Sequence, residues 1–475
     1  MRFFFSKQTS RAKLTDINYG GHWKRLIFFR ISSREDHMSE KRMNGPTLVF
    51  VITLISVLNF GNSCLAQQKE KRKIPSRQLP IEERDQGDSF IENLGELPGD
   101  IVTLPFKIVF KGLGFAARII DHHGVLLRVS DWLTSEDEKT KVRPSFTPGS
   151  GGGFAFRRND IFKRGMDFRG SAYFGVRTRR NLYAGLRDSQ LLSSRFGLEA
   201  AGFYARLPDE DFFGIGNNAV AERETNYLYE ERNFKFDLLS KIGRNRIAVG
   251  ISYSNTDIKK GRDPNKPTLQ DSVDTFFPEG IPGLTGAKMW SFQIKFYHHT
   301  RNETGHPTEG GETFIAYEFS DQIGGESFAY RKFTLDLRRY TNLFYKRVLA
   351  LRFRAEITNR FQNGQIPFYR LAALGGQFGL RGYRPVRFRD RDAMLGGIEY
   401  RWQVHTWAIA YGFFEEGRVF SDMLEDFSFD DFRYTFGGGL RFRGQDGGLI
   451  AVLEIAKSKE QIRLNFGLNT EIGRF

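Results

Sequence analysis

Residues 349–358, LALRFRAEIT, decide the fold class of this chain. Leu349, Leu351 and Phe353 begin an apolar set that recurs at every second position, and Arg352 and Arg354 lie on the alternate positions. Successive side chains of a β-strand point to opposite faces, so this segment predicts a strand with one apolar and one charged face. Seven other stretches alternate in the same way: 168–177, 234–238, 247–254, 290–296, 333–338, 432–443 and 462–469.

The composition excludes several classes of protein. Of the 475 residues 15% are aromatic, which excludes a disordered chain. A single cysteine excludes a disulfide framework and a zinc site built from cysteines. The mean hydropathy of −0.44 argues against a bundle of membrane helices. It is compatible with a membrane β-barrel, whose strands alternate polar and apolar residues. The net charge of +15 fits an anionic partner or a basic channel interior.

Two all-β folds fit the alternation: a soluble antiparallel sheet with one wet face, and a transmembrane antiparallel β-barrel. The segments are about 9 to 13 residues long, which matches a tilted membrane strand better than a soluble one. Large aromatic residues dominate the apolar set, as expected of side chains that face lipid. We therefore predict a transmembrane antiparallel barrel of about 16 strands, within a range of about 12–16.

Connection lengths give the orientation of this barrel. The long connections 207–228, 257–286, 361–392 and 421–431 all follow odd-numbered strands and are predicted to be extracellular. The connection 300–311 breaks the rule, which allows a different count in the middle of the barrel. The candidate strands lie near 141–147, 152–161, 168–178, 181–190, 195–206, 229–240, 246–256, 287–299, 312–320, 327–339, 347–360, 393–405, 406–420, 432–444, 449–458 and 461–473.

The N-terminal part predicts export. An apolar run at 48–60 follows Lys41 and Arg42 and precedes a small-residue cleavage position at Ala66, as in a secretory signal peptide. The alternative is a lipoprotein with Cys64 as the lipid acceptor. The predicted organisation is a leader over 1–66, a flexible linker over 67–99, a periplasmic amphipathic helical segment over 100–140, and an outer-membrane barrel over 141–475.

One predicted loop carries a specific motif. Residues 366–392 read IPFYRLAALGGQFGLRGYRPVRFRDRD, and Arg381, Gly382 and Tyr383 form an Arg-Gly-aromatic triplet. Here the chain resembles the bacterial surface antigen family, whose superfamily includes outer-membrane protein insertases and two-partner secretion transporters. The resemblance implies that Arg381, at the tip of the sixth extracellular loop, pairs inside the lumen with acids on the next two strands. The first acid matches Glu399, in a Gly-x-x-Glu pattern. The second is Asp in the family and Glu415 here.

Elementary electrostatics supports the same constellation. A long arginine-rich loop in a wide lumen must be anchored, and Arg381 with two lumen-facing carboxylates supplies charge-assisted, bidentate bonds. Gly382 permits a tight turn and a close backbone approach, and Tyr383 can wedge against the wall. The alternative is an ordinary exposed triplet on a loop.

The resemblance extends to two other segments and departs from the family in one respect. Residues 367–376 and 212–217 also resemble the family. Family insertases carry periplasmic POTRA domains ahead of the barrel, and residues 67–140 lack their mixed strand and helix pattern. The resemblance therefore implies a short branch without these domains, or with helices in their place.

The sequence thus predicts a barrel that acts in outer-membrane protein or lipid assembly or translocation. Its expected partners are outer-membrane lipid and nascent outer-membrane proteins or secreted polypeptide, and we expect a monomeric barrel. The alternative is a passive, anion-favouring channel. Motifs of hydrolases, metalloproteases and phosphate-binding loops are missing, so we expect neither an enzyme nor a cofactor or metal. Nucleic acid is not expected, because the arginines are spread over strands. The arginines predicted to face the lumen are Arg169, Arg177, Arg352, Arg354, Arg441 and Arg443.

Overall fold

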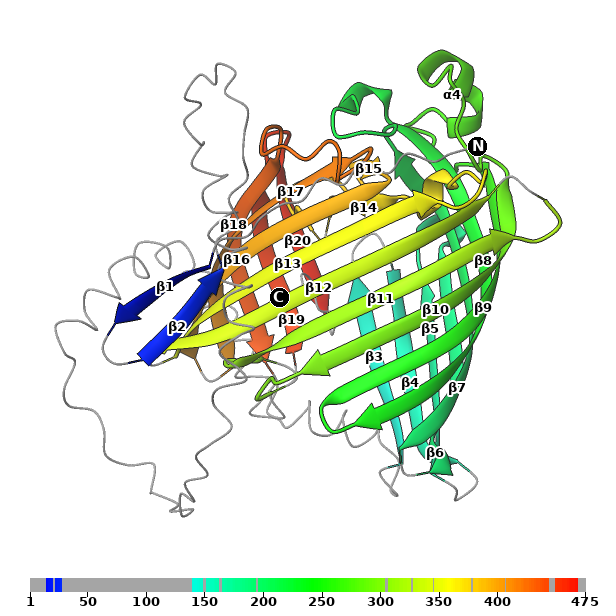
Figure 1. Ribbon diagram of the computed structural model, residues 1–475. Coiled ribbons are helices and arrows are strands. Elements are labelled where there is room, and N and C mark those ends of the chain that lie inside the picture. Colours follow the sequence, from blue (N-terminus) through cyan, green and yellow to red (C-terminus); the bar gives the residue numbers. More distant parts are fainter. Residues whose placement is uncertain are drawn as a thin grey trace, which may run out of the picture. The chain divides into compact units, whose positions relative to one another are not determined.

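Figure 1 shows the computed structural model, which describes residues 14–19, 22–27, 139–147, 151–161, 165–193, 195–303, 306–325, 328–344, 346–376, 379–405, 407–443 and 449–468. The chain divides into two units, residues 1–45 and 46–475. In the first unit, β1 (Leu14–Tyr19) and β2 (His22–Ile27) pair as an antiparallel hairpin, where the sequence predicted no strand. The predicted signal segment, linker and amphipathic helices lie outside the described residues.

The second unit contains a closed antiparallel ring of 16 strands, which confirms the predicted fold class and strand number. The ring closes where β20 pairs with β3 through Leu468 and Phe146. Its first strand begins at Thr140, one residue before the predicted boundary. The strands are β3 (Thr140–Thr147), β4 (Gly151–Ile161), β5 (Met166–Phe174), β6 (Arg180–Ser193), β7 (Phe196–Phe212), β8 (Thr225–Ile242), β9 (Asn245–Lys260), β10 (Gly286–His299), β11 (Gly310–Gln322), β12 (Ala329–Phe344), β13 (Arg347–Arg360), β16 (Asp392–His405), β17 (Ala408–Phe420), β18 (Arg433–Arg443), β19 (Leu449–Lys457) and β20 (Ile462–Leu468).

The two faces of the wall follow the alternation in the sequence. On β8 the side chains of Phe234 and Phe236 face outward and are 62% and 46% exposed, whereas Asp237 faces the lumen and is 5% exposed. On β10 the outward Trp290 and Phe292 are 52% and 40% exposed. An apolar exterior around a polar interior is the arrangement of a barrel whose outer solvent is lipid. It excludes the soluble sheet, whose apolar face would be buried.

Connections between antiparallel neighbours alternate between the two ends of the barrel. The long connections 213–224, 261–285, 361–391 and 421–432 all lie at one end, here called the loop end, and the opposite end is called the turn end. The connection 300–309, which broke the rule of short turns, does not reflect a miscounted strand. It folds inward instead: His306 is 6% exposed, and the carbonyl oxygen of Pro307 accepts a hydrogen bond from Arg401 at 3.3 Å.

The prediction that Arg177 faces the lumen from a strand is wrong. Strand β5 ends at Phe174, and Arg177 lies in the 3-10 turn η1 (Val176–Thr178) with a φ of 54°. A positive φ breaks the extended backbone that a strand requires. The Arg177 guanidinium therefore lies at the loop end, where it pairs with Asp209 and Asp263, each at 3.0 Å.

A short helix, α4 (Leu269–Phe276), lies in the connection 261–285 at the loop end (Figure 1). Its N-terminus is capped by Thr268, whose hydroxyl oxygen accepts a hydrogen bond from the backbone N–H of Asp271. Within the described ranges, no helix combines the length and apolar character needed to cross a membrane.

Candidate functional site

The connection between β13 and β16, residues 361–391, is here called the lumen loop. Its own strands β14 (Ala372–Leu374) and β15 (Phe388–Asp390) pair with each other, which returns the chain on itself around the Arg-Gly-Tyr tip. Gly375 and Gly376 follow β14 with φ values of 117° and 84°, a conformation that L side chains rarely adopt. A Cβ atom on Gly375 would also lie 2.2 Å from the carbonyl oxygen of Arg384. These glycines allow the tight hairpin that carries the tip.

Arg381 lies at the centre of the site and its side chain is fully buried. Its Nε donates to Glu415 Oε1 at 2.9 Å, and its backbone N–H donates to Glu415 Oε2 at 3.0 Å. Its Nη1 donates to Glu454 Oε2 at 2.6 Å and reaches Glu399 Oε2 at 3.5 Å. The structure thus brings Arg381 together with both acids that the sequence singled out. The nearer contacts are to Glu415 and Glu454.

Gly382 and Tyr383 position the tip against the wall. The N–H of Gly382 donates to the hydroxyl oxygen of Thr435 at 3.0 Å. A Cβ atom on Gly382 would lie 2.4 Å from that oxygen and 2.8 Å from the carbonyl carbon of Lys457. The close approach, and not a positive φ, therefore requires glycine here; the positive φ of the tip falls on Leu380, at 56°. Tyr383 is 2% exposed, and its ring packs edge-on against Phe388 at 5.1 Å.

The charges around Glu399 are balanced by two further arginines. Arg441 donates to both carboxylate oxygens of Glu399, at 2.6 and 3.0 Å, and Arg401 donates to one of them at 2.7 Å. Burial lowers the pKa of the Arg381 guanidinium, but the charges of Glu415, Glu454 and Glu399 outweigh burial and hold that pKa above its ordinary value. Arg381 is therefore a permanent buried cation, and paired carboxylates are what make such a charge tolerable.

The sequence did not point to Glu454, although it is fully buried and makes the shortest contact to Arg381. The hydroxyl of Tyr411 and the amide of Asn465 also donate to Glu454, at 2.8 and 3.0 Å. Arg381 in turn lies over the ring of Phe413, 3.4 Å from its centroid. The signal that points to Glu454 is a lone carboxylate in strand β19, where residues 449–456 are otherwise apolar.

The stem of the lumen loop packs under the loop end of the barrel. Phe368 is fully buried, and its ring lies 5.1 Å from that of Phe212 and 5.1 Å from that of Tyr227. The two segments that resembled the family therefore meet here, since Phe212 belongs to one and Phe368 to the other. The apolar cluster around them includes Ile258, Leu269, Met289, Phe328, Tyr330, Ile366 and Leu371. Strands, α4 and the lumen loop thus share one core at the loop end.

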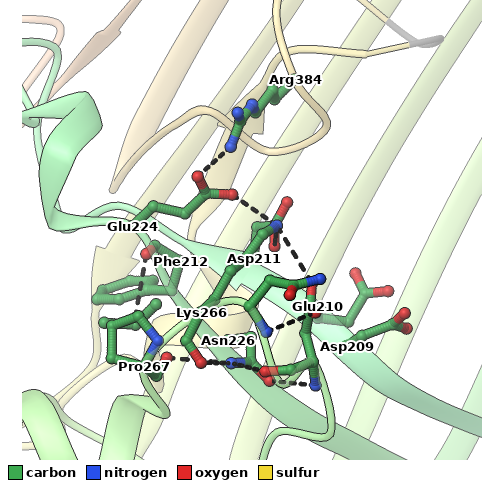
Figure 2. A network of polar contacts seen from close by, with 12 residues as sticks. Asp209, Glu210, Asp211, Phe212, Glu224, Asn226, Lys266, Pro267 and Arg384 are labelled. Carbon is green, nitrogen blue, oxygen red and sulfur yellow. Dashed lines mark hydrogen bonds and ion pairs between the residues drawn. The ribbon is translucent and has the colours of Figure 1, made fainter. Parts of the chain in front are cut away.

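A second ionic contact of the lumen loop lies closer to solvent (Figure 2). Arg384 pairs with Glu224, and Glu224 also pairs with Lys266 at 2.6 Å. Lys266 reaches Asp211 at 2.6 Å. Burial raises the pKa of Glu224, but hydrogen bonds from Lys266 and Arg384 outweigh it and hold the pKa below its ordinary value. This network links the lumen loop to the connections 213–224 and 261–285.

Three further lumen arginines are paired with acids. Arg352 donates to Asp336 at 2.8 Å, and Arg443 reaches Glu303 at 3.4 Å. Arg354 pairs with Glu356 in the same way. Among the residues that the structure describes, no group of three His, Cys, Asp or Glu side chains is arranged to hold a metal ion. The predominant chemistry of the described lumen is therefore ionic pairing between arginine and carboxylate.

The chain belongs to a known family. The sequence profile of the Omp85 superfamily domain matches residues 154–471, so the chain belongs to the Omp85 superfamily. This confirms the resemblance found in the sequence, and it makes the chain an outer-membrane barrel of the insertase and transporter class.

A solved structure agrees on the fold. The chain is similar to BamA from Haemophilus ducreyi lacking POTRA domains 1–3, with a TM-score of 0.51 and 14% identity over 70% of each chain. It also matches CdiB from Escherichia coli, with a TM-score of 0.48 and 11% identity over 69% of this chain and 62% of the other. No curated protein matches the chain.

Proposed function

We propose that the chain acts in the assembly or translocation of proteins or lipids at the outer membrane, with its lumen held closed at rest by the lumen loop. The observation that carries the proposal is the fully buried Arg381, which contacts carboxylates on β16, β17 and β19. In this proposal Arg381, Gly382, Tyr383, Glu399 and Glu415 act as the anchor of the loop. The loop end is extracellular and the N-terminal segment is periplasmic.

An anchor of this kind holds because buried charges are costly to separate. Withdrawing the tip would leave Glu415 and Glu454 without their shared cation in a place that water does not reach. Such an unpaired buried charge costs about 3–5 kcal/mol. The loop therefore occupies one position in the resting barrel. A barrel with a filled lumen can act in two ways: at its wall, as an insertase does, or after the loop is displaced, as in a transporter.

Nascent outer-membrane protein or secreted polypeptide is the first candidate partner, and outer-membrane lipid is the second. We propose a monomeric barrel without enzymatic activity or cofactor.

The alternative function is a passive, anion-favouring channel. One observation favours it: Arg169 on β5 and Arg187 on β6 face the lumen on the side of the barrel away from the tip, and both are partly exposed. A basic wall of this kind attracts anions. The two functions differ in what the lumen loop does to ion flow.

Single-channel conductance of the full chain in planar bilayers tests the proposal. The wild type is compared with Arg381→Ala, and Arg244→Ala in the exposed β8–β9 turn serves as the matched control. We expect low, flickering conductance that rises in Arg381→Ala and stays at the wild-type level in Arg244→Ala. A large, steady wild-type conductance that Arg381→Ala does not change would overturn the anchor and favour the channel.

A folding assay tests the activity itself. Liposomes that contain the chain are mixed with an unfolded outer-membrane barrel protein, and its folding is followed by the shift in electrophoretic mobility of unheated samples. Faster folding than in empty liposomes is the expected result. Equal rates in both would count against insertion of proteins.

A further inference from the structure

Strands β6–β10 carry a belt of cations on their outer face, at the loop end. The belt consists of Arg180, Arg206, Arg232, Lys259 and Lys288. The strand register places Arg180 opposite Arg206, and Arg206 opposite Glu230. Because directly paired residues share a face, these side chains point away from the lumen, as their neighbours Leu182 and Phe234 do. The belt spans five strands, or about 20 Å at the usual spacing.

Each strand changes character at the belt. On β8 the outward face passes from Phe236 and Phe234 to Arg232, and on β10 it passes from Phe292 and Trp290 to Lys288. On β6 the outward residue after Arg180 is Leu182. The apolar side chains are those that face lipid, and aromatic residues mark its boundary with water. The belt therefore lies where lipid headgroups begin.

The cations of the belt exceed the acids beside them. Glu230 accepts contacts from Arg206, Arg232 and Lys259 at 3.4, 3.2 and 3.3 Å, and it is itself only 5% exposed. Asp257 is the second acid, 3.6 Å from Arg232. Glu230 thus holds three cationic heads together, while the side chains of Arg232 and Lys259 remain 48% and 56% exposed.

Arg180 and Lys288, at the two edges of the belt, are both exposed. Neither has an ion-pair partner among the residues that the structure describes. Five cations against two carboxylates leave a net positive surface next to the membrane.

The belt lies on the β6–β10 side of the ring. Its five cations stand against two acids of the same wall, Glu230 and Asp257, so the outer face of β6–β10 is complementary to an anion.

We propose that this belt binds the phosphate groups of a phosphorylated glycolipid in the outer leaflet of the membrane. Guanidinium groups bind phosphate oxygens through paired hydrogen bonds, and clusters of four or more Lys and Arg at a membrane surface recognise anionic headgroups. The long stems of Arg and Lys lie along the apolar wall while their heads reach the headgroup layer. This proposal rests on the extracellular orientation of the loop end given above.

The test is native mass spectrometry of the full chain in detergent with three probes: lipid A with two phosphates, the same lipid without phosphates, and phosphatidylethanolamine. The test variant is Arg180→Gln with Lys288→Gln, which leaves the Glu230 cluster intact. The control is Lys241→Gln with Arg244→Gln, which removes the same charge from exposed residues at the turn end. A cation at an anionic membrane surface is worth about fivefold in affinity, so the test variant should bind the diphosphorylated lipid about 25-fold more weakly.

Three results would overturn the proposal: equal binding of the phosphate-free lipid, equal weakening in both double variants, or no weakening in the test variant. If the test variant binds as well as the wild type, an acidic protein and not a glycolipid would be the ligand of the belt. Both double variants should keep the wild-type conductance and folding activity. Loss of lipid binding with normal conductance is therefore distinct from a failure of the proposed assembly function.

Discussion

Two arginines of the lumen loop, three residues apart, make opposite kinds of contact. Arg381 is fully buried and forms ion pairs with three carboxylates of the barrel wall. Arg384 is 41% exposed and pairs with one carboxylate, Glu224 (Figure 2). The residue type and the loop are the same, so the difference lies in the surroundings. Water solvates Arg384 when its partner is removed, whereas nothing but protein surrounds Arg381. Position in the loop therefore decides how much each ion pair matters.

The largest expected effect is that of Arg381→Ala on stability. It leaves two buried carboxylates without their cation, so the free energy of unfolding should fall by about 3–5 kcal/mol. Arg384→Ala is the matched control and should cost at most about 1 kcal/mol, because exposed ion pairs contribute little. Denaturant titration of the barrel in lipid vesicles, followed by tryptophan fluorescence, measures both. Equal losses in the two variants would show that burial does not distinguish them.

Glu454→Gln comes next in size. The substitution keeps the shape but removes the charge that accepts hydrogen bonds from Arg381 at 2.6 Å and Tyr411 at 2.8 Å. A hydrogen bond to a charged group is worth about 1.5–3 kcal/mol, and a loss of this size is expected in the same titration. Glu303→Gln is the control, since the Glu303 side chain is 51% exposed at the turn end. A loss in Glu454→Gln no larger than in the control would remove Glu454 from the anchor.

Glu454 is the part of the site that the sequence did not predict, whereas it predicted Glu399 and Glu415. The period of two is local, so it gave the strands, their number and the outward or inward direction of most side chains. The acids Glu399 and Glu415 follow the loop directly on the next two strands. Glu454 lies 73 residues after Arg381, and only the ring order of the barrel brings β19 to the tip.

The prediction for Arg177 was wrong for a different reason. The alternation continues past the true end of β5, and nothing in the pattern signals the positive φ that turns the chain there. The inward fold of the connection at 300–309 was likewise not predictable from its length. Its contact with Arg401 depends on the register of distant strands.

Gly382→Ala should have the next smaller effect. The new Cβ atom would lie 2.4 Å from Thr435 Oγ1 and 2.8 Å from the backbone carbonyl carbon of Lys457, so the tip must move away from the barrel wall. Overpacking of this kind costs about 1–3 kcal/mol. Gly412→Ala is the control, because the nearest atom to its Cβ would be 3.8 Å away. Conductance should rise in Gly382→Ala and stay unchanged in Gly412→Ala. An unchanged Gly382→Ala would mean that the tip has room to spare.

The smallest effect is the pH dependence of the Arg384 contact, and it separates the two ionic sites of the loop. The pKa of Glu224 is lowered in the folded protein, so its contribution is complete above the ordinary carboxyl pKa. That contribution is lost as the pH falls through the lowered value. Burial lowers the pKa of Lys266, but Asp211 and Glu224 outweigh burial and raise that pKa above its ordinary value. Glu224 and Lys266 are therefore both charged at pH 7 and at pH 5, so openings of the wild-type barrel should be equally rare at these two pH values.

Below about pH 4 the openings should become more frequent as Glu224 is protonated. In Glu224→Gln the contact is already broken, so its openings should be more frequent than those of the wild type at pH 7 and change less on acidification. The increase should remain small beside that of Arg381→Ala, because the buried tip stays in place when only the exposed contact is lost. Identical pH profiles of the wild type and Glu224→Gln would mean that the exposed network does not hold the loop, and that the buried arginine acts alone.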